Sequence, residues 1–298
     1  VIGHLDSPVY LGGVAVGATA TSFLFMMLLF LRMSTTGLTA QAWGAKDPQR
    51  LARALVQPLA LALGAGVLII LLRLPLIDLA LHIVGGSEAV LEQARRFLEI
   101  RWLSAPASLA NLVLLGWLLG VQYARAPVIL LVVGNLLNIV LDLWLVMGLR
   151  MNVQGAALAT VTAEYATLII GLLMAKRVLT LRGVSLAMLK NAWRGDLRRL
   201  LALNRDIMLR SLLLQLCFGA LTVFGARLGS DIVAVNAVLM TMLTFTAYAL
   251  DGFAYAVEAH SGQAYGARDG SQLLEVWRAA CRQSGMVALA FALIYSLA

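Results

Sequence analysis

Three polar side chains interrupt the apolar stretch at about 127–148: Asn135, Asn138 and Asp142. At 100° per residue in a helix they lie within about 60° of one another and form a single polar stripe. An Asn one turn before an Asp can hydrogen-bond its carboxyl group. Burial favours the neutral carboxyl whereas amide donors favour the charged one, so Asp142 could bind and release a proton near neutral pH. The alternative is that Asp142 lies near the helix end and reaches interfacial water.

A second polar set follows helical spacing along the stretch at about 231–257. Tyr248, Asp251, Tyr255 and Glu258 recur at steps of three and four residues and share one helix face. Carboxylates attract positive charge and Tyr rings stack on organic cations, so this face could be a second-lobe or substrate site. In the alternative interpretation, Glu258 extends its carboxylate to water near the end of its helix.

Glu164 is a further ionisable residue in the middle of an apolar stretch. Such groups cost a few kcal/mol at membrane depth, so each is a candidate functional residue. Glu164 could join the Asp142 cluster or pair across helices with Gln122 or Arg101.

The elements that position these residues must be membrane-spanning helices. Hydrophobic residues make up 61% of the 298 residues, charged residues make up 13%, and the mean hydropathy is +0.88. Soluble domains are about 45–50% apolar and about 25% charged. One globular core of this length could not bury the excess apolar surface. The composition therefore excludes a soluble enzyme, a disordered chain and a disulfide scaffold.

Stretches of about 20 apolar residues predict the spans, since that length crosses the hydrocarbon core. Residues 73–96 are too polar to cross and are expected to lie at the membrane surface. The predicted fold is therefore an all-α polytopic membrane protein with eight visible spans, at about 9–33, 51–72, 97–122, 127–148, 152–175, 204–228, 231–257 and 273–298.

Basic residues indicate which side of the membrane each loop faces. Nine of the 23 Lys and Arg residues lie between Lys176 and Arg210, which predicts a basic cytoplasmic linker at 176–203 by the positive-inside rule. The basic 41–53 loop is four predicted helices away and should face the same side. Aromatic residues do not interleave with the basic cluster, so a nucleic-acid partner is not expected.

The sequence repeats itself at an offset of 222 residues. Gln-Ala-Trp-Gly-Ala-Lys-Asp at 41–47 matches Gln-Ala-Tyr-Gly-Ala-Arg-Asp at 263–269. Two copies related in this way predict two parallel six-helix repeats, of which about eight of about twelve spans are visible. We expect an N-terminal lobe at 1–175 (spans 2–6), the linker at 176–203, and the start of a C-terminal lobe at 204–298 (spans 7–9). The chain would then be a fragment that lacks the first helix and the last ones.

Motifs of enzymes and of metal or nucleotide sites are absent from the sequence. It contains no Gly-x-x-x-x-Gly-Lys-Ser/Thr loop, Gly-x-Ser-x-Gly elbow, Cys-x-x-Cys pair or His-Glu-x-x-His motif, and its three histidines are scattered. We therefore expect no enzyme activity, no cofactor and no metal site.

Several segments resemble the MATE (multidrug and toxic compound extrusion) family of transporters. They are Gly3-His4-Leu5 leading into 11–15, Gly44-Ala45-Lys46, and Asp251-Gly252-Phe253-Ala254 running to Glu258. The resemblance is strongest to the branch named for DNA-damage-inducible protein F. It implies an antiporter of the bacterial inner membrane with two six-helix lobes around a central cavity. It also implies export of amphipathic, often cationic, small molecules in exchange for protons or sodium.

The resemblance also assigns roles to particular residues. The family's Asn-x-x-x-Asp pair is matched by Asn138 and Asp142, and its polar position on the next helix is matched by Thr160. Sodium-type members carry a Glu on the seventh helix, whereas residues 207–226 contain no acid here, which favours protons as the coupling ion. The family's main proton acceptor, an Asp of the first helix, would lie upstream of Val1. We expect a monomer in the bilayer.

Three other functions compete with this hypothesis. A flippase for lipid-linked saccharides has a related fold and would place several Arg residues in its cavity, but the spans offer only flanking Arg32, Arg101 and Arg210. A non-transporting membrane scaffold would tolerate neutralisation of Asp142 and Asp251. An intramembrane enzyme acting on lipid would turn over in detergent without any gradient.

Overall fold

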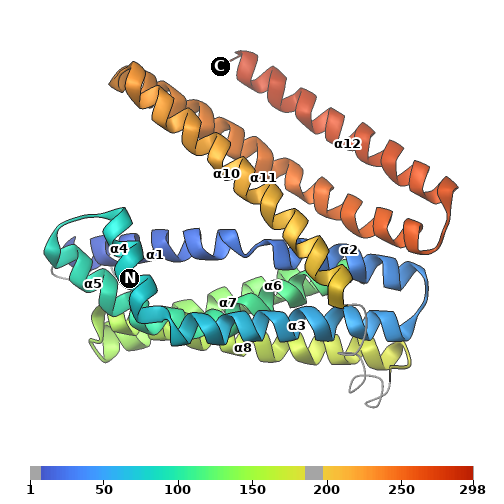
Figure 1. Cartoon of the computed structure of the whole chain (residues 1–298), viewed down its shortest axis with the longest axis horizontal. Helices are drawn as coiled ribbons and strands as arrows, with labels where there is room; N and C mark the ends of the chain where they lie inside the picture. The colour runs from blue at the N-terminus through green and yellow to red at the C-terminus, as the bar shows by residue number, and fades with distance from the viewer. Residues whose placement is uncertain (1–7, 185–196, 298) are drawn as a thin grey trace.

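The computed structural model describes residues 8–184 and 197–297, and 92% of these residues are helical, with no strand among them. This confirms the expected all-α fold. The helices form two groups that meet at one end and diverge toward the other (Figure 1). The first group contains α1 (Pro8–Met27), α2 (Phe30–Gly44), α3 (Pro48–Leu71), α4 (Arg73–Val84), α5 (Glu88–Arg101), α6 (Ala105–Gly120), α7 (Arg125–Asp142) and α8 (Asn152–Leu181). The second contains α10 (Leu197–Leu228), α11 (Ser230–Gly266) and α12 (Gly270–Leu297).

Seven helical segments in the described part of the chain are long and apolar enough to cross a membrane. They are Pro48–Leu71, Glu88–Gly120, Arg125–Gly148, Asn152–Leu181, Arg198–Leu228, Ser230–Gly266 and Gly270–Leu297. The chain is therefore a multi-pass membrane protein. The expected span at 9–33 is wrong as a single helix, because the chain breaks at Leu28 and Leu29 between α1 and α2.

The expected loop at 41–53 is much shorter in the structure, because α2 continues to Gly44 and α3 begins at Pro48. Asp47 caps α3, and its carboxylate accepts hydrogen bonds from the backbone N–H groups of Gln49 and Arg50 at 3.1 and 3.3 Å. Pro48 suits the first helical turn, where its missing N–H has no partner to lose. The first repeated motif thus forms a helix end rather than a loop.

The second copy of the motif ends its helix in the same way. The N–H groups of Ala45 and Ala267 donate to the carbonyls of Gln41 and Gln263 at 3.0 and 2.9 Å. Both helices then close with a left-handed residue, Lys46 at φ 54° in one copy and its counterpart at φ 57° in the other. The sequence repeat is therefore also a repeat of backbone conformation.

The expected surface segment at 73–96 is only partly correct. Ser87 caps α5, which continues through a 3₁₀ turn at Trp102–Ser104 into α6, so the third span begins near residue 88 instead of 97. Phe97 and Leu98 are buried in this early part. The linker expected at 176–203 is partly helical, because α8 reaches Leu181 and α10 begins at Leu197. Residues 185–196 of that linker lie outside the described residues.

The core of the first group surrounds α6. Leu114, Trp117 and Leu118 of α6 are fully buried, and glycines bring α2 close: a Cβ at Gly116 would lie 2.5 Å from the Arg32 carbonyl oxygen. By contrast, α10, α11 and α12 leave most of their large apolar side chains exposed. Exposed apolar surface of that extent requires hydrocarbon or protein around it.

Candidate functional site

A cavity of about 260 Å³ lies between α6, α7 and α8 in the first group. Six polar residues line it among apolar neighbours: Asn111, Asn135, Asn138, Thr160, Glu164 and Thr167. Four of the six are candidate residues of the sequence analysis: Asn135 and Asn138 lie on α7, and Thr160 and Glu164 lie on α8. The tertiary fold therefore brings the polar stripe of α7 to the polar positions of α8.

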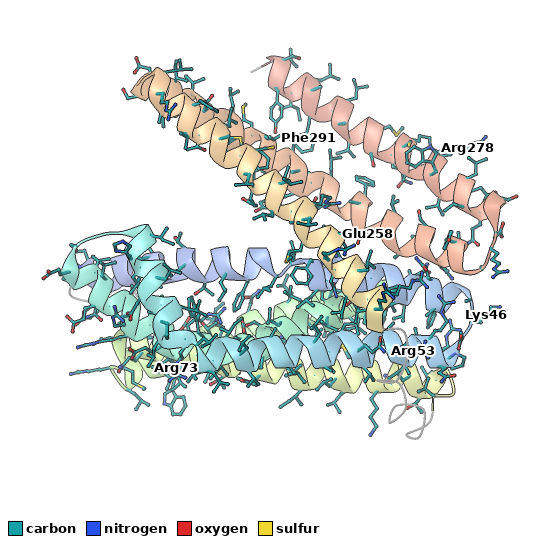
Figure 2. All side chains as sticks on the ribbon, viewed as in Figure 1. Lys46, Arg53, Arg73, Glu258, Arg278 and Phe291 are labelled. Carbon is teal, nitrogen blue, oxygen red and sulfur yellow. The ribbon has the colours of Figure 1, made fainter. Side chains whose placement is uncertain are left out.

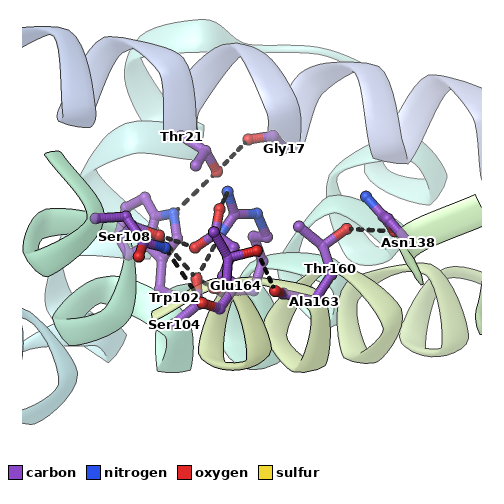
Figure 3. Close-up of polar contacts among 12 residues, drawn as sticks. Gly17, Thr21, Trp102, Ser104, Ser108, Asn138, Thr160, Ala163 and Glu164 are labelled. Carbon is purple, nitrogen blue, oxygen red and sulfur yellow. Dashed lines mark hydrogen bonds and ion pairs between the residues drawn. The ribbon is translucent and has the colours of Figure 1, made fainter. Parts of the chain in front are cut away.

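Asn138 and Thr160 join the two helices directly. The Thr160 hydroxyl donates toward the Asn138 amide oxygen at 3.4 Å (Figure 3). It also donates toward its own helix, at the Ala156 carbonyl, at 3.2 Å. Asn135 lies one turn earlier on α7 and is exposed at the cavity wall. These three residues form one polar surface inside an apolar lobe.

Asp142 lies one turn beyond Asn138 and does not line the cavity. It is the last residue of α7, it is half-buried, and a π-helical turn at Leu143–Gly148 follows it. Its Oδ1 is buried and has no hydrogen-bond partner among the described residues. The hydrogen bond that Asn138 could donate is therefore not made at this oxygen. A π-helical turn shifts the helix register, and such turns are frequent at functional sites.

Glu164 forms an ion pair with Arg101, which is one of the partners that the sequence analysis considered for it. Arg101 Nη2 donates to Glu164 Oε1 at 3.0 Å, and the two side chains are only 12% and 25% exposed. Ser108 also donates to the carboxylate, and Arg101 donates to Ser104 (Figure 3). Glu164 thus ties α8 to α5 and α6, and it also lines the cavity.

Two of the four residues expected on the α11 face meet the other helix group. Arg32 Nη1 of α2 lies 3.5 Å from Glu258 Oε2, and the Arg32 guanidinium lies 4.3 Å from the centre of the Tyr255 ring. Figure 2 shows Glu258 where the second group crosses the first. Asp251 is half-buried with no hydrogen bond or ion pair in the described part of the chain, and the Tyr248 side chain is exposed. The Glu258 side chain is 32% exposed, so its contact with Arg32 does not exclude the alternative in which the carboxylate also reaches water.

Arg32 is the residue that sequence reasoning missed, since it was considered only as a flanking residue. Its side chain is 3% exposed, and its Nε and Nη2 have no hydrogen-bond partner among the described residues. The signal was present: a single Arg stands in the apolar run that includes Leu28, Leu29 and Leu31. A cation within such a run is a functional candidate by default.

The two copies of the repeated motif contact each other. A Cβ added at Gly44 would overlap the Gln263 carbonyl, and one added at Gly266 would overlap the Gln41 carbonyl. Gly44 and Gly266 are equivalent residues of the two copies, and so are Gln41 and Gln263. Each copy therefore makes the same contact with the other, as the two sides of a two-fold interface do. Gly262 meets its own counterpart, Ala40, between them. The helices α2 and α11 therefore cross on a pseudo-two-fold axis.

No group of three or more His, Cys, Asp or Glu side chains that could hold a metal ion occurs among the described residues. The polar groups that line the cavity between α6, α7 and α8 are instead amides, hydroxyls and the carboxylate of Glu164. Such groups can hydrogen-bond an organic molecule or exchange a proton.

The MatE family model matches residues 1–144 and 207–298 of the chain. The chain is 88% identical over all 298 residues to DNA damage-inducible protein F of Escherichia coli (strain K12), of which it covers 65%. It is 28% identical over 172 residues to a probable multidrug resistance protein NorM of Bacillus anthracis, which is 56% of this chain and 38% of that protein.

Solved structures share the fold. One described as MATE in the bent conformation superposes with a TM-score of 0.81 at 26% identity, over 95% of this chain and 64% of that one. A second structure is described as an outward-facing conformation of a multidrug resistance MATE family transporter of the MOP superfamily. It superposes with a TM-score of 0.77 at 25% identity, over 98% of this chain and 65% of that one. The chain thus spans about 65% of the length of the Escherichia coli relative and of these two structures, and 38% of the Bacillus anthracis relative.

Proposed function

Because this chain belongs to the MatE family, whose members are transporters and not enzymes, we propose that the protein exports small molecules by antiport with a cation. The observation that carries the proposal is the polar cavity of Asn135, Asn138 and Thr160, with Asp142 one turn away and its buried Oδ1 unpartnered. A carboxyl group without fixed partners can change its charge without breaking a structural ion pair.

We propose that protons are the coupling ion, since residues 207–226 of α10 contain no acid. Protonation neutralises Asp142 on one side of the membrane and lowers the affinity for a cationic, amphipathic substrate. Deprotonation on the other side restores that affinity. A membrane potential of 100 mV supplies about 2.3 kcal/mol per charge, enough for roughly fifty-fold accumulation per proton.

Alternating access fits the arrangement of the two helix groups. They meet closely where α2 crosses α11, at the end where α8 stops and α10 starts, and they lie apart at the other end (Figure 1). We infer that the meeting end faces the cytoplasm, because the basic residues around 176–203 lie there. In this orientation the divergent end opens outward from a bacterial inner membrane, and the protein acts as a monomer.

The test is efflux of a fluorescent organic cation from vesicles that contain the full-length protein. Asp142→Asn should abolish the component of efflux driven by a pH gradient, because the variant cannot bind or release a proton at this site. The matched control is Asp206→Asn, which removes an exposed carboxylate whose ion pair in the described part of the chain is with its neighbour Arg205 on α10.

Unchanged pH-driven efflux in a normally expressed Asp142→Asn protein would remove this residue from the mechanism. The flippase alternative loses support because two of the three flanking arginines, Arg32 and Arg101, each pair with a glutamate. Transport of a lipid-linked saccharide without a proton gradient would favour it again.

A further inference from the structure

The 222-residue offset aligns whole helices as well as the repeated motif. It places Ser230–Gly266, which is α11, on residues 8–44, which form α1 and α2. The first copy is broken at Leu28 and Leu29, where backbone hydrogen bonds run to the third residue back instead of the fourth, as from the Leu31 N–H to the Leu28 carbonyl. The second copy is one continuous helix of 37 residues. Equivalent segments of the two repeats therefore differ in shape at one position.

The residues that α11 carries at the position of this break are suited to a helix end. The offset places Asp251 on Leu29 and Gly252 on Phe30. Leu29 precedes α2 and makes no side-chain cap, whereas Asp is among the best residues there, because its carboxylate accepts hydrogen bonds from the first N–H groups of a helix. Gly weakens the interior of a helix. A Cβ at Gly252 would meet no atom within 4 Å, so close packing does not require this glycine.

Contacts divide α11 at the same position into a first part, residues 230–250, and a second part, residues 252–266. In the second part, Glu258 pairs with Arg32 of the first helix group. In the first part, the Phe245 ring packs on a Phe ring of α12, with 5.8 Å between the ring centres. The second part is thus docked on the first helix group, whereas the first part is packed within the second group.

A cavity gives the second part of α11 room to change its angle to α12. The cavity measures about 430 Å³, lies between the two helices, and is lined on the α11 side by Phe253, Ala256, Val257 and His260. All four belong to the second part, whereas the first part contacts α12 directly through Phe245. The second part can therefore move into this space while the first part stays packed on α12.

We propose that Asp251 and Gly252 form a hinge at which α11 bends, and that the Asp251 carboxylate caps the second part in the bent form. The carboxylate then accepts hydrogen bonds from the N–H groups two or three residues further on. The first part moves with α10 and α12, and the second part stays docked on α2. The inference rests on the alternating access proposed above, because bending changes the angle between the helix groups and keeps the crossing of α2 and α11.

The test measures the end-to-end length of α11 in the full-length protein in lipid nanodiscs, with spin labels at the exposed residues Asp231 and Ala267. Their Cα atoms lie about 54 Å apart in a straight helix, and a bend of about 40° shortens that distance by about 3 Å. We expect a straight and a bent population. A single straight population would overturn the proposal.

Two further outcomes separate the hinge from the proposed function. If the distance from Asp231 to Arg95 of α5 varies while the distance from Asp231 to Ala267 is fixed, the groups move as rigid bodies. Alternating access is then retained and the hinge is overturned. If α11 bends but Asp142→Asn leaves pH-driven efflux unchanged, the hinge is supported and the proposed coupling at Asp142 fails.

Variants locate the hinge and separate capping from charge. Asp251→Ala should lower the ratio of bent to straight helix at least threefold, whereas Asp251→Asn should change it less than twofold, because Asn caps a helix as well as Asp does. Gly252→Ala should also lower the ratio at least threefold, since Ala stabilises the straight helix. Gly285→Ala is the matched control: it replaces an exposed glycine of α12 that also has no atom within 4 Å of its Cβ position, and it should change the ratio less than twofold. Equal losses in Asp251→Ala and Asp251→Asn, or equal ratios in Gly252→Ala and Gly285→Ala, would overturn the proposal.

Discussion

A carboxyl group in an apolar lobe is stable when cations or hydrogen-bond donors surround it. Glu164 has both, from Arg101 and Ser108, whereas Oδ1 of Asp142 has neither among the described residues. The two residues looked equivalent as ionisable groups in apolar stretches. Their surroundings favour a structural role for Glu164, whereas Asp142 remains the residue at which we propose proton exchange.

At the scale of single residues, we predict that Glu164→Gln destabilises the protein. The variant keeps the shape of the side chain but leaves the Arg101 charge, which is mostly buried, without its counter-charge. The free energy of unfolding in detergent should fall by roughly 1–3 kcal/mol. Glu92→Gln is the matched control, because it removes an exposed pair with Arg96 on one helix, and its cost should stay below about 0.5 kcal/mol. Similar losses in both variants would contradict the structural role.

The helices α2 and α11 depend on small residues where they cross. Gly44 and Gly266 each lie against the backbone of the opposite motif, and Ala40 meets Gly262 between them. Backbones can approach this closely only where a side chain is absent or very small. The Gly-Ala steps of the repeated motif therefore set the distance between the two helix groups.

The prediction for these elements is that Gly44→Ala forces α2 and α11 apart. Overpacking of this kind costs roughly 1–3 kcal/mol, and spin labels on the two helices near the motif should report a longer distance. Gly37→Ala adds the same methyl group to the same helix at a position with no atom within 4 Å, so it should leave that distance unchanged. If Gly44→Ala behaves like Gly37→Ala, the close crossing is not what sets the spacing.

At the scale of the whole molecule, two polar contacts between the helix groups lie close to the crossing of α2 and α11. One is the pair of Arg32 with Glu258, supported by the Tyr255 ring. Another connects Gln122, after α6, with Gln263 of α11. Both lie on the side where the groups meet, and both must change if the groups rock against each other during transport.

We therefore expect Arg32→Gln and Glu258→Gln to be coupled in the full-length protein. Each single variant leaves one charge without its partner, so the double variant should be more stable than the sum of the single effects predicts, by roughly 0.5–3 kcal/mol. Spin labels at Arg95 and Asp231, one on each group, should show broader distance distributions in the single variants. Strictly additive effects, with unchanged distributions, would show that the pair does not hold the groups together.

The sequence by itself determined the fold class, most of the spanning helices and the internal repeat. These features depend on local properties, since about 20 apolar residues must form a helix in hydrocarbon to satisfy their backbone. The repeat was visible because two copies of one motif preserve the same helix end, down to the caps at Asp47 and Asp269. The polar stripe of Asn135 and Asn138 followed from helical periodicity alone.

Only the tertiary structure decided which of these polar residues share a site. The partner of Glu164 lies 63 positions away and the partner of Glu258 lies 226 positions away, and no local pattern selects among the possible partners. Periodicity places a side chain on a face of its own helix, but packing between helices decides what that face meets.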